Sequence, residues 1–191
     1  PHPCLCIIHG VSGSGKSRLA LGLRACLPLI HLRSDIERKR LFGLTAQART
    51  HPGTVSAGIY APDAGERTYG RLLALAETLL DAGYSPLVDA TFLKGVQRAP
   101  FLDLAKAKDL PCQMLACEAP TEVLRERVLR RAAEGADPSE AGVDVLEAQL
   151  VSREALNADE LALTLRVDTT QASCQEDVIQ RLAAACHWRL S

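Results

Sequence analysis

The sequence predicts a three-layer α/β fold, in which a five-stranded parallel sheet is covered by helices on both faces. Two observations support this prediction. Short apolar runs alternate with segments of helical periodicity along the chain, and the first apolar run leads directly into the glycine-rich stretch GVSGSGKSRL. Strands separated by helices favour parallel pairing through right-handed crossovers. The 191 residues fit one domain, which we expect to span 1–191.

Three strands and two helices are predicted in the first half of the chain. The strands are the apolar runs 4–9, 29–32 and 85–90. The helices have leucines at helical spacing and cover 16–26 and 62–82. Pro28 ends the first helix and Gly83 ends the second.

The second half continues the alternation. Strands are predicted at 112–117 and 163–167, and helices at 96–108, 120–133, 143–155 and 175–187. The polar run 134–142 is predicted to be a loop, and the Gly-, Pro- and Thr-rich segment 44–61 is predicted to be irregular or mobile.

Composition narrows the classes of function. At 47% hydrophobic and 24% charged, the chain has the composition of an ordinary globular protein. A formal net charge of −1 gives no field that attracts a long polyanion, so duplex DNA is not expected as a partner. Aromatic residues make up 4% of the chain and leave few platforms on which single strands could stack.

The seven cysteines include no C-x-x-C pair, and their odd number argues against a closed disulfide framework. We therefore expect reduced thiols in the core of a cytoplasmic protein. The sequence contains no apolar run of membrane-spanning length and no visible signal peptide, so no membrane partner is expected. Because the chain begins Pro1-His2-Pro3 without a methionine, we expect a piece of a longer protein or a trimmed chain.

The functional residues are expected at one edge of the sheet. In open parallel sheets, ligands bind outside the carboxyl ends of the strands. Polar or acidic residues follow every predicted strand: 10–17, 34–35, 89–91, Glu118 and 168–170. Because these segments meet at one edge, the sequence predicts a single site there.

The frame Gly10-x-x-x-x-Gly15-Lys16-Ser17 matches the phosphate-binding P-loop pattern. Its glycines permit a sharp turn whose N–H groups point at phosphate oxygens, and the following helix adds its positive dipole end. Lys16 is expected to reach the β- and γ-phosphates, and the Ser17 hydroxyl is expected to ligate Mg²⁺. The residues expected to hold the nucleotide in and beside this loop are Gly10, Ser12, Gly13, Ser14, Gly15, Lys16, Ser17 and Arg18.

Other motifs narrow the class of P-loop protein. The Asn-Lys-x-Asp motif, by which GTPases read the base, is absent from the sequence, so adenine is the default base. ATPases of the AAA type usually end an apolar strand in Asp-Glu, whose Glu activates water, whereas here Asp89 is followed by Ala90. A carboxylate for Mg²⁺ without a water-activating Glu favours phosphoryl transfer to a substrate over hydrolysis.

Four segments spread over nearly the whole chain are similar to one group of proteins. HGVSGSGKS, SDIERKRL, VDATF and APTEVLRERVLRR resemble the small P-loop kinases grouped with polynucleotide 5′-kinase, zeta toxin, chloramphenicol phosphotransferase and gluconate kinase. Within this group, the chain most resembles bacterial predicted kinases, which are often fused behind an aminoglycoside-phosphotransferase-like domain. The resemblance implies a nucleoside-kinase-like P-loop fold with a helical lid, and a fused or partner domain upstream of residue 1.

The resemblance also assigns roles to residues after the second and third strands. It implies that Asp35 is the general base for the attacking hydroxyl and that Arg38 grips a substrate phosphate. Phosphoryl transfer itself requires a carboxylate opposite the P-loop, while the alternative is that Asp35 caps a helix beginning at Glu37. Asp89 is expected to ligate Mg²⁺ or, with Thr91, to bind the substrate; its alternative is a turn or cap carboxylate.

In the resembling kinases, the lid closes on ATP and places an arginine against the transferring phosphate. Here the lid is expected at about 130–145. Among the candidate arginines we favour Arg127 and Arg131 as catalytic, with Arg130 next. Thr169 is expected at the adenine edge, although ordinary turn polarity explains it about as well.

Three charged or polar residues near these motifs are expected to be structural. Lys39 and Arg40 are predicted to lie on a solvated basic face of a helix. His9 is predicted to pack at the end of the first strand.

The sequence therefore predicts an ATP- and Mg²⁺-dependent kinase that phosphorylates a hydroxyl of a small molecule, with 44–61 as part of the acceptor site. Two alternatives remain. The pair Asp35 and Arg38 favours a polynucleotide 5′-hydroxyl kinase that acts on an oligonucleotide. A nucleotide-sensing module that regulates a fused partner is the second alternative. Near-neutral charge and scarce aromatic residues favour the small-molecule acceptor.

Overall fold

The computed structural model describes residues 3–45, 62–134 and 142–188. Within these residues, one five-stranded sheet has the order β2-β3-β1-β4-β5, and all its neighbours pair in parallel. The strands are β1 (Leu5–His9), β2 (Leu29–Arg33), β3 (Ser85–Asp89), β4 (Cys112–Glu118) and β5 (Thr164–Asp168). The predicted fold class is confirmed, and each strand lies within about one residue of its predicted bounds.

Helices connect the strands. They are α1 (Lys16–Cys26), α2 (Ser34–Leu41), α3 (Pro62–Asp81), α4 (Gly95–Ala107), α5 (Thr121–Glu134), α6 (Val143–Ser152), α7 (Ala158–Ala162) and α8 (Cys174–Ala185). Among the described residues, no helix combines the length and the apolar character that crossing a membrane requires.

Three helices differ from the prediction. α2 begins at Ser34, in a segment for which only a helix start at Glu37 was considered. α6 ends at Ser152, earlier than predicted, because Arg153 turns to an extended conformation without a Gly or Pro to mark the stop. α7 was not predicted because its five residues are too few to show a helical period. A capping box between Asn157 and Glu160 begins it. Most of the predicted loop 134–142 and of segment 44–61 lies outside the described residues.

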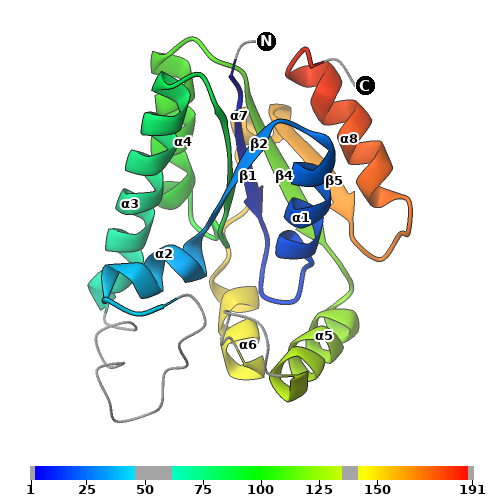
Figure 1. Cartoon of the computed structure of the whole chain (residues 1–191). Helices are drawn as coiled ribbons and strands as arrows, with labels where there is room; N and C mark the ends of the chain where they lie inside the picture. Colours follow the sequence, from blue (N-terminus) through cyan, green and yellow to red (C-terminus); the bar gives the residue numbers. More distant parts are fainter. Residues whose placement is uncertain (1–2, 46–61, 135–141, 189–191) are drawn as a thin grey trace.

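The helices form two outer layers (Figure 1). α1 and α8 cover one face of the sheet, and α3 and α4 cover the other. The side chains of β1 alternate between them: Cys6 and Ile8 pack with the first pair of helices, and Leu5 and Ile7 with the second. Because β1 is buried on both faces, its sequence is a continuous apolar run.

Helices α2, α5 and α6 lie at the carboxyl edge of the sheet (Figure 1). A third apolar cluster at this edge joins Val11, in the loop after β1, to Leu124 and Val128 of α5 and Leu146 of α6. All four side chains are buried. The glycine-rich loop is therefore packed directly against α5 and α6.

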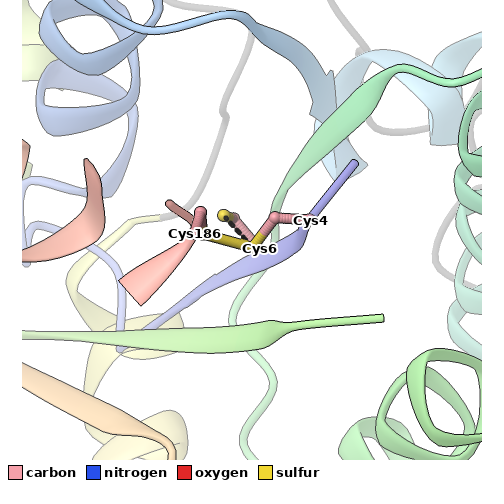
Figure 2. Close-up of side chains that lie close together, drawn as sticks. All are labelled: Cys4, Cys6 and Cys186. Atoms are coloured by element: carbon pink, nitrogen blue, oxygen red, sulfur yellow. Dashed lines mark hydrogen bonds between the residues drawn. A yellow bond between two sulfur atoms is a disulfide. The ribbon is translucent and has the colours of Figure 1, made fainter. Parts of the chain in front are cut away.

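The prediction that every cysteine is reduced is wrong for two of the seven. Cys4, which precedes β1, and Cys186, which follows α8, form a disulfide, and Cys6 Sγ lies 3.8 Å from Cys4 Sγ (Figure 2). The cysteines that remain free are Cys6, Cys26, Cys112, Cys117 and Cys174. Sequence spacing could not reveal the pair, because its partners are 182 residues apart and only the packing of α8 beside β1 brings them together.

Candidate active site

The P-loop connects β1 to α1 and requires glycine at several positions. Gly10, Gly13 and Gly15 have φ of 147°, 78° and 89°, in the region that side chains rarely adopt. Space is also lacking: a Cβ on Gly10 would lie 2.6 Å from Ser14 Oγ, and one on Gly13 would lie 2.7 Å from the Leu124 carbonyl oxygen. The motif glycines are therefore fixed by both conformation and packing.

The first turn of α1 is open to an anion. Gly15 is the N-cap, no side chain caps the helix, and its first turn contains no acidic residue. The first N–H groups of the helix and its positive dipole end are thus left for a phosphate. A cavity of about 450 Å³ lies over this end and is lined by the P-loop, by α5 and by the segment after β5. Among its lining residues is the exposed Arg18.

Lys16 lies at the centre of the charged groups. Its Nζ donates to the Val11 carbonyl oxygen at 2.9 Å. Burial lowers the pKa of Lys16, while the carboxylates of Asp89 and Asp35 act to raise it and the charge of Arg131 acts to lower it further. Three residues predicted for the site therefore lie within electrostatic range of the P-loop lysine.

Asp89 is the most deeply buried carboxylate of the site and is held from both sides. Ser17 Oγ donates to Asp89 Oδ2 at 2.8 Å, and His31 Nε2 lies 3.1 Å from the same oxygen. The side chains of His31 and Asp89 are only 3% and 5% exposed. This arrangement follows from the strand order, because β3 lies between β1 and β2.

The charge state of Asp89 decides the tautomer of His31. Burial raises the pKa of Asp89, but the hydrogen bond from His31, the charge of Lys16 and the hydrogen bond from Ser17 together bring it below the ordinary value. Asp89 is therefore ionised at neutral pH and accepts, so His31 Nε2 carries the proton. Sequence reasoning missed His31; its position two residues before the end of the strand that pairs with β3 was the available signal.

Ser17 and Asp89 provide the donor set that a magnesium ion requires. Mg²⁺ prefers hard oxygen ligands, and P-loop proteins hold it with a loop hydroxyl and an aspartate. The Ser17 hydroxyl and the Asp89 carboxylate are already joined by a hydrogen bond. These two residues therefore fit the ion.

Asp35 lies in the first turn of α2, directly after β2. Both of its carboxylate oxygens accept from Arg33, at 3.1 Å from Nε and 2.6 Å from Nη2. α2 begins at Ser34 with Arg33 as its N-cap, so the helix start at Glu37 in the capping alternative is wrong, although Asp35 Oδ1 does accept from the Ile36 N–H of the first turn at 2.8 Å. The Asp35 side chain is 24% exposed and remains accessible to a ligand.

The rest of α2 is more buried than its sequence suggests. Lys39 is buried, so the prediction of a solvated face is wrong for this residue, whereas Arg40 is exposed and pairs with Glu37. The reason is that α2 packs on α3, where Arg71 Nε donates to Glu37 at 2.6 Å. Arg38 Nε is buried and has no hydrogen-bond partner among the described residues.

Thr91 is held at the site by α3. The Tyr69 hydroxyl lies 3.3 Å from Thr91 Oγ1 and accepts from the Phe92 N–H at 2.9 Å. Phe92 has a φ of 48° in the left-handed region, and its carbonyl oxygen accepts from Arg98 at 3.0 Å. Arg98 in turn forms a buried ion pair with Glu160 at 2.6 Å. Sequence reasoning missed Tyr69, because its position on the apolar face of a predicted helix indicated only a core residue.

Arg127 and Thr169 form a wall of the cavity beside the P-loop. Arg127 donates to Thr169 Oγ1 at 2.8 Å and to the Thr169 carbonyl oxygen at 2.9 Å, and it also reaches the Gly13 carbonyl oxygen at 3.3 Å. Thr169 Oγ1 donates to the Ser14 carbonyl oxygen at 2.9 Å. The other two predicted arginines, Arg130 and Arg131, also line the cavity, and Arg130 is exposed and lies 3.9 Å from Glu134.

His9 is half-buried at the end of β1. Burial and the charges of Arg98 and Lys16 lower the pKa of His9 to about 4, so the imidazole is neutral at physiological pH. Its Nε2 has no hydrogen-bond partner among the described residues. His9 also lines a second cavity, together with Gly10, Val11 and Ser14 of the P-loop.

The structure thus gathers most of the predicted residues at the carboxyl edge of the sheet. Lys16, Ser17, Asp35, Asp89 and Arg131 converge, and their roles stay predictions. Residues 46–61, within the predicted acceptor segment, and residues 135–141, within the predicted lid, lie outside the described part of the chain.

Comparison with known proteins agrees with this geometry. Residues 5–156 match the family AAA_33, described as an AAA domain. An uncharacterized protein of Mycobacterium tuberculosis (strain H37Rv) is 28% identical over 133 residues, which are 70% of this chain and 26% of that protein. The match therefore spans about a quarter of the length of this curated relative.

Solved structures share the fold. A sugar kinase from Janibacter sp. HTCC2649 is 21% identical, with 97% of this chain and 94% of that chain covered and a TM-score of 0.64. Kti12 of Chaetomium thermophilum, solved in complex with ADP-AlF3, is 16% identical, with 95% and 98% covered and a TM-score of 0.70. At such identities the likeness establishes the fold.

Proposed function

This chain belongs to the AAA_33 family of AAA domains, and we propose that it is an ATP- and Mg²⁺-dependent kinase that transfers the γ-phosphate to a hydroxyl of a small molecule. The observation that carries the proposal is that two carboxylates lie within electrostatic range of Lys16: Asp89 at the end of β3, and Asp35 in the first turn of α2, directly after β2. Asp89 is engaged with Ser17, the candidate metal ligand, which leaves Asp35 to face an acceptor.

The cavity over α1 supports a nucleotide triphosphate. The P-loop N–H groups and Lys16 would bind the phosphates, and the wall formed by Arg127 and Thr169 would border the adenine. Ser17 and Asp89 would hold Mg²⁺, which when bound neutralises charge on the β- and γ-phosphates. Arg131 would add a positive charge beside Lys16.

Asp35 has the position and chemistry to orient the acceptor. In the transition state of phosphoryl transfer, a carboxylate that accepts the hydroxyl proton aligns the attacking oxygen. Arg33 holds both oxygens of Asp35 and so fixes the direction of the carboxylate. As the new oxygen–phosphorus bond forms, the hydroxyl proton passes to Asp35 and ADP leaves.

The environment beyond Asp35 supports a small acceptor that carries an anionic group. Arg38 Nε is buried without a partner in the described residues, and a carboxylate or phosphate of the acceptor would satisfy it. The hydroxyls of Tyr69 and Thr91 provide further polar contacts. A net charge of −1 and 4% aromatic residues make a long nucleic acid the weaker candidate.

Measurement of acceptor-dependent ADP release tests the proposal. The acceptors would be sugars, sugar acids, nucleosides, aminoglycosides and a 5′-hydroxyl oligonucleotide, with Lys16→Met as the background control. Release with a small alcohol supports the proposal. Release with the oligonucleotide alone would replace it by the polynucleotide alternative. ATP binding without release for any acceptor would leave a nucleotide-sensing module.

A further inference from the structure

We propose that Gln149 of α6 is a positioning residue, which sets Lys16 for phosphate binding through the peptide group between Val11 and Ser12. The inference rests on the proposed nucleotide site. Gln149 Oε1 accepts from the Ser12 backbone N–H at 2.7 Å. On the other side of the same peptide group, the Val11 carbonyl oxygen accepts from Lys16 Nζ at 2.9 Å and from the Ser14 N–H at 3.2 Å.

The two hydrogen bonds are coupled because they share one rigid unit. A trans peptide is planar, and its C=O and N–H point in opposite directions. The described residues contain no cis peptide bond. A rotation of the Val11–Ser12 peptide plane that breaks the bond to Gln149 would therefore also turn the Val11 oxygen away from Lys16. Gln149 and Lys16 therefore bond to opposite sides of the same peptide group.

The helix that carries Gln149 is packed against the P-loop. Leu146, three positions earlier on the same face of α6, is fully buried in the apolar cluster that also contains Val11. Ser12 is only 7% exposed, so water has little access to its N–H in place of the glutamine. The position of α6 is thereby transmitted to the P-loop by one apolar contact and one hydrogen bond.

This arrangement matters for Lys16 because its side chain is anchored to the Val11 oxygen. Lys16 Nζ donates to the Val11 carbonyl oxygen at 2.9 Å, so the orientation of that oxygen sets where the ammonium group lies. Fixing the Val11 oxygen holds the ammonium in place before a phosphate arrives. Replacement of Gln149 would therefore weaken the binding of the β- and γ-phosphates and spare the binding of adenosine and the α-phosphate.

A double-mutant cycle on nucleotide affinity tests the inference. We expect Gln149→Met to lower ATP and ADP affinity by about tenfold in the natural background and by less than about twofold in Lys16→Met, because the two residues act through one peptide. AMP affinity should not change. Val151→Ser, which alters an exposed residue of the same helix, is the matched control and should leave every affinity unchanged.

Equal losses in both backgrounds, equal losses for AMP and ATP, or no loss at all would overturn the inference. If the natural protein binds no nucleotide, the proposed function fails instead, so the two failures are distinct. Should Gln149→Met not fold, hydrogen exchange of the Ser12 amide in Lys16→Met measures the same coupling in reverse. Exchange several-fold faster than in the natural protein is expected, and equal rates would contradict the inference.

Discussion

Ser17 and Asp89 are 72 positions apart in the chain and are joined by a hydrogen bond of 2.8 Å. The bond links the start of α1 to the end of β3, and it forms because β3 pairs directly with β1. Both residues are candidate magnesium ligands. Their oxygens are thus brought together by the fold itself, so little rearrangement is needed for an ion to bind.

Replacement of His31 tests how this carboxylate is oriented. His31→Leu removes the donor 3.1 Å from Asp89 Oδ2. It should lower the affinity of the nucleotide-bound protein for Mg²⁺ by about 10- to 100-fold. His31→Gln keeps an N–H donor and should recover most of the loss. A magnesium titration of ADP binding measures both. Equal behaviour of the two variants would show that the hydrogen bond is unimportant.

The buried pair of Arg98 and Glu160 should be costly to break from one side. Its side chains are 2% and 3% exposed, so Arg98→Met leaves an unpaired buried carboxylate and should reduce the free energy of unfolding by about 3–5 kcal/mol. Adding Glu160→Leu should restore much of this. Urea unfolding measures both changes. Arg181→Met, which breaks an exposed pair with Asp177, is the control and should cost less than about 1 kcal/mol.

His9 should make the protein acid-sensitive. The pKa of His9 is lowered from 6.5 to about 4 in the folded state. Between these two values, His9 binds a proton in the unfolded chain and stays neutral in the folded protein. The contribution of neutral His9 to the free energy of unfolding is fully present above pH 6.5. It is lost as the pH falls toward 4, a decrease of about 3 kcal/mol. Urea unfolding between pH 7.5 and 4 should show a smaller decline for His9→Gln. Parallel declines would rule out this contribution.

The disulfide between Cys4 and Cys186 should stabilise the fold by restricting the unfolded chain. Its partners are 182 residues apart, and the chain-entropy relation gives about 5 kcal/mol as an upper value. A reductant should lower the unfolding midpoint of the natural protein and leave Cys186→Ser unaffected. Thiol titration after denaturation should find the five free cysteines before reduction. Seven thiols before reduction would contradict the disulfide.

The sequence was sufficient to predict the strands, because each is a short apolar run ended by glycine, proline or a polar group. The gathering of the P-loop, Asp35 and Asp89 at one edge was also predicted, since they directly follow strands whose carboxyl ends meet in a parallel sheet. These are local signals: a composition, a period or a spacing of a few residues is enough to read them.

The residues that sequence reasoning missed depend on contacts between distant segments. His31 acquires its role only because β2 lies beside β3, and Tyr69 only because α3 packs beside Thr91. Lys39 looked solvated because its burial depends on α3. The Cys4–Cys186 pair is fixed by the position of α8, which no spacing encodes. Each of these four features depends on tertiary packing, which cannot be read from a single sequence.

The central claim is that phosphate held by the P-loop is transferred to an alcohol oriented by Asp35. Its most direct test compares ATP affinity and acceptor-dependent ADP release in the natural protein and in Asp35→Ala, with Asp63→Ala as an exposed-carboxylate control. We predict that Asp35→Ala reduces transfer by about 10²- to 10⁴-fold and leaves ATP affinity unchanged. Undiminished transfer, or a loss of transfer fully explained by lost ATP affinity, would contradict the claim.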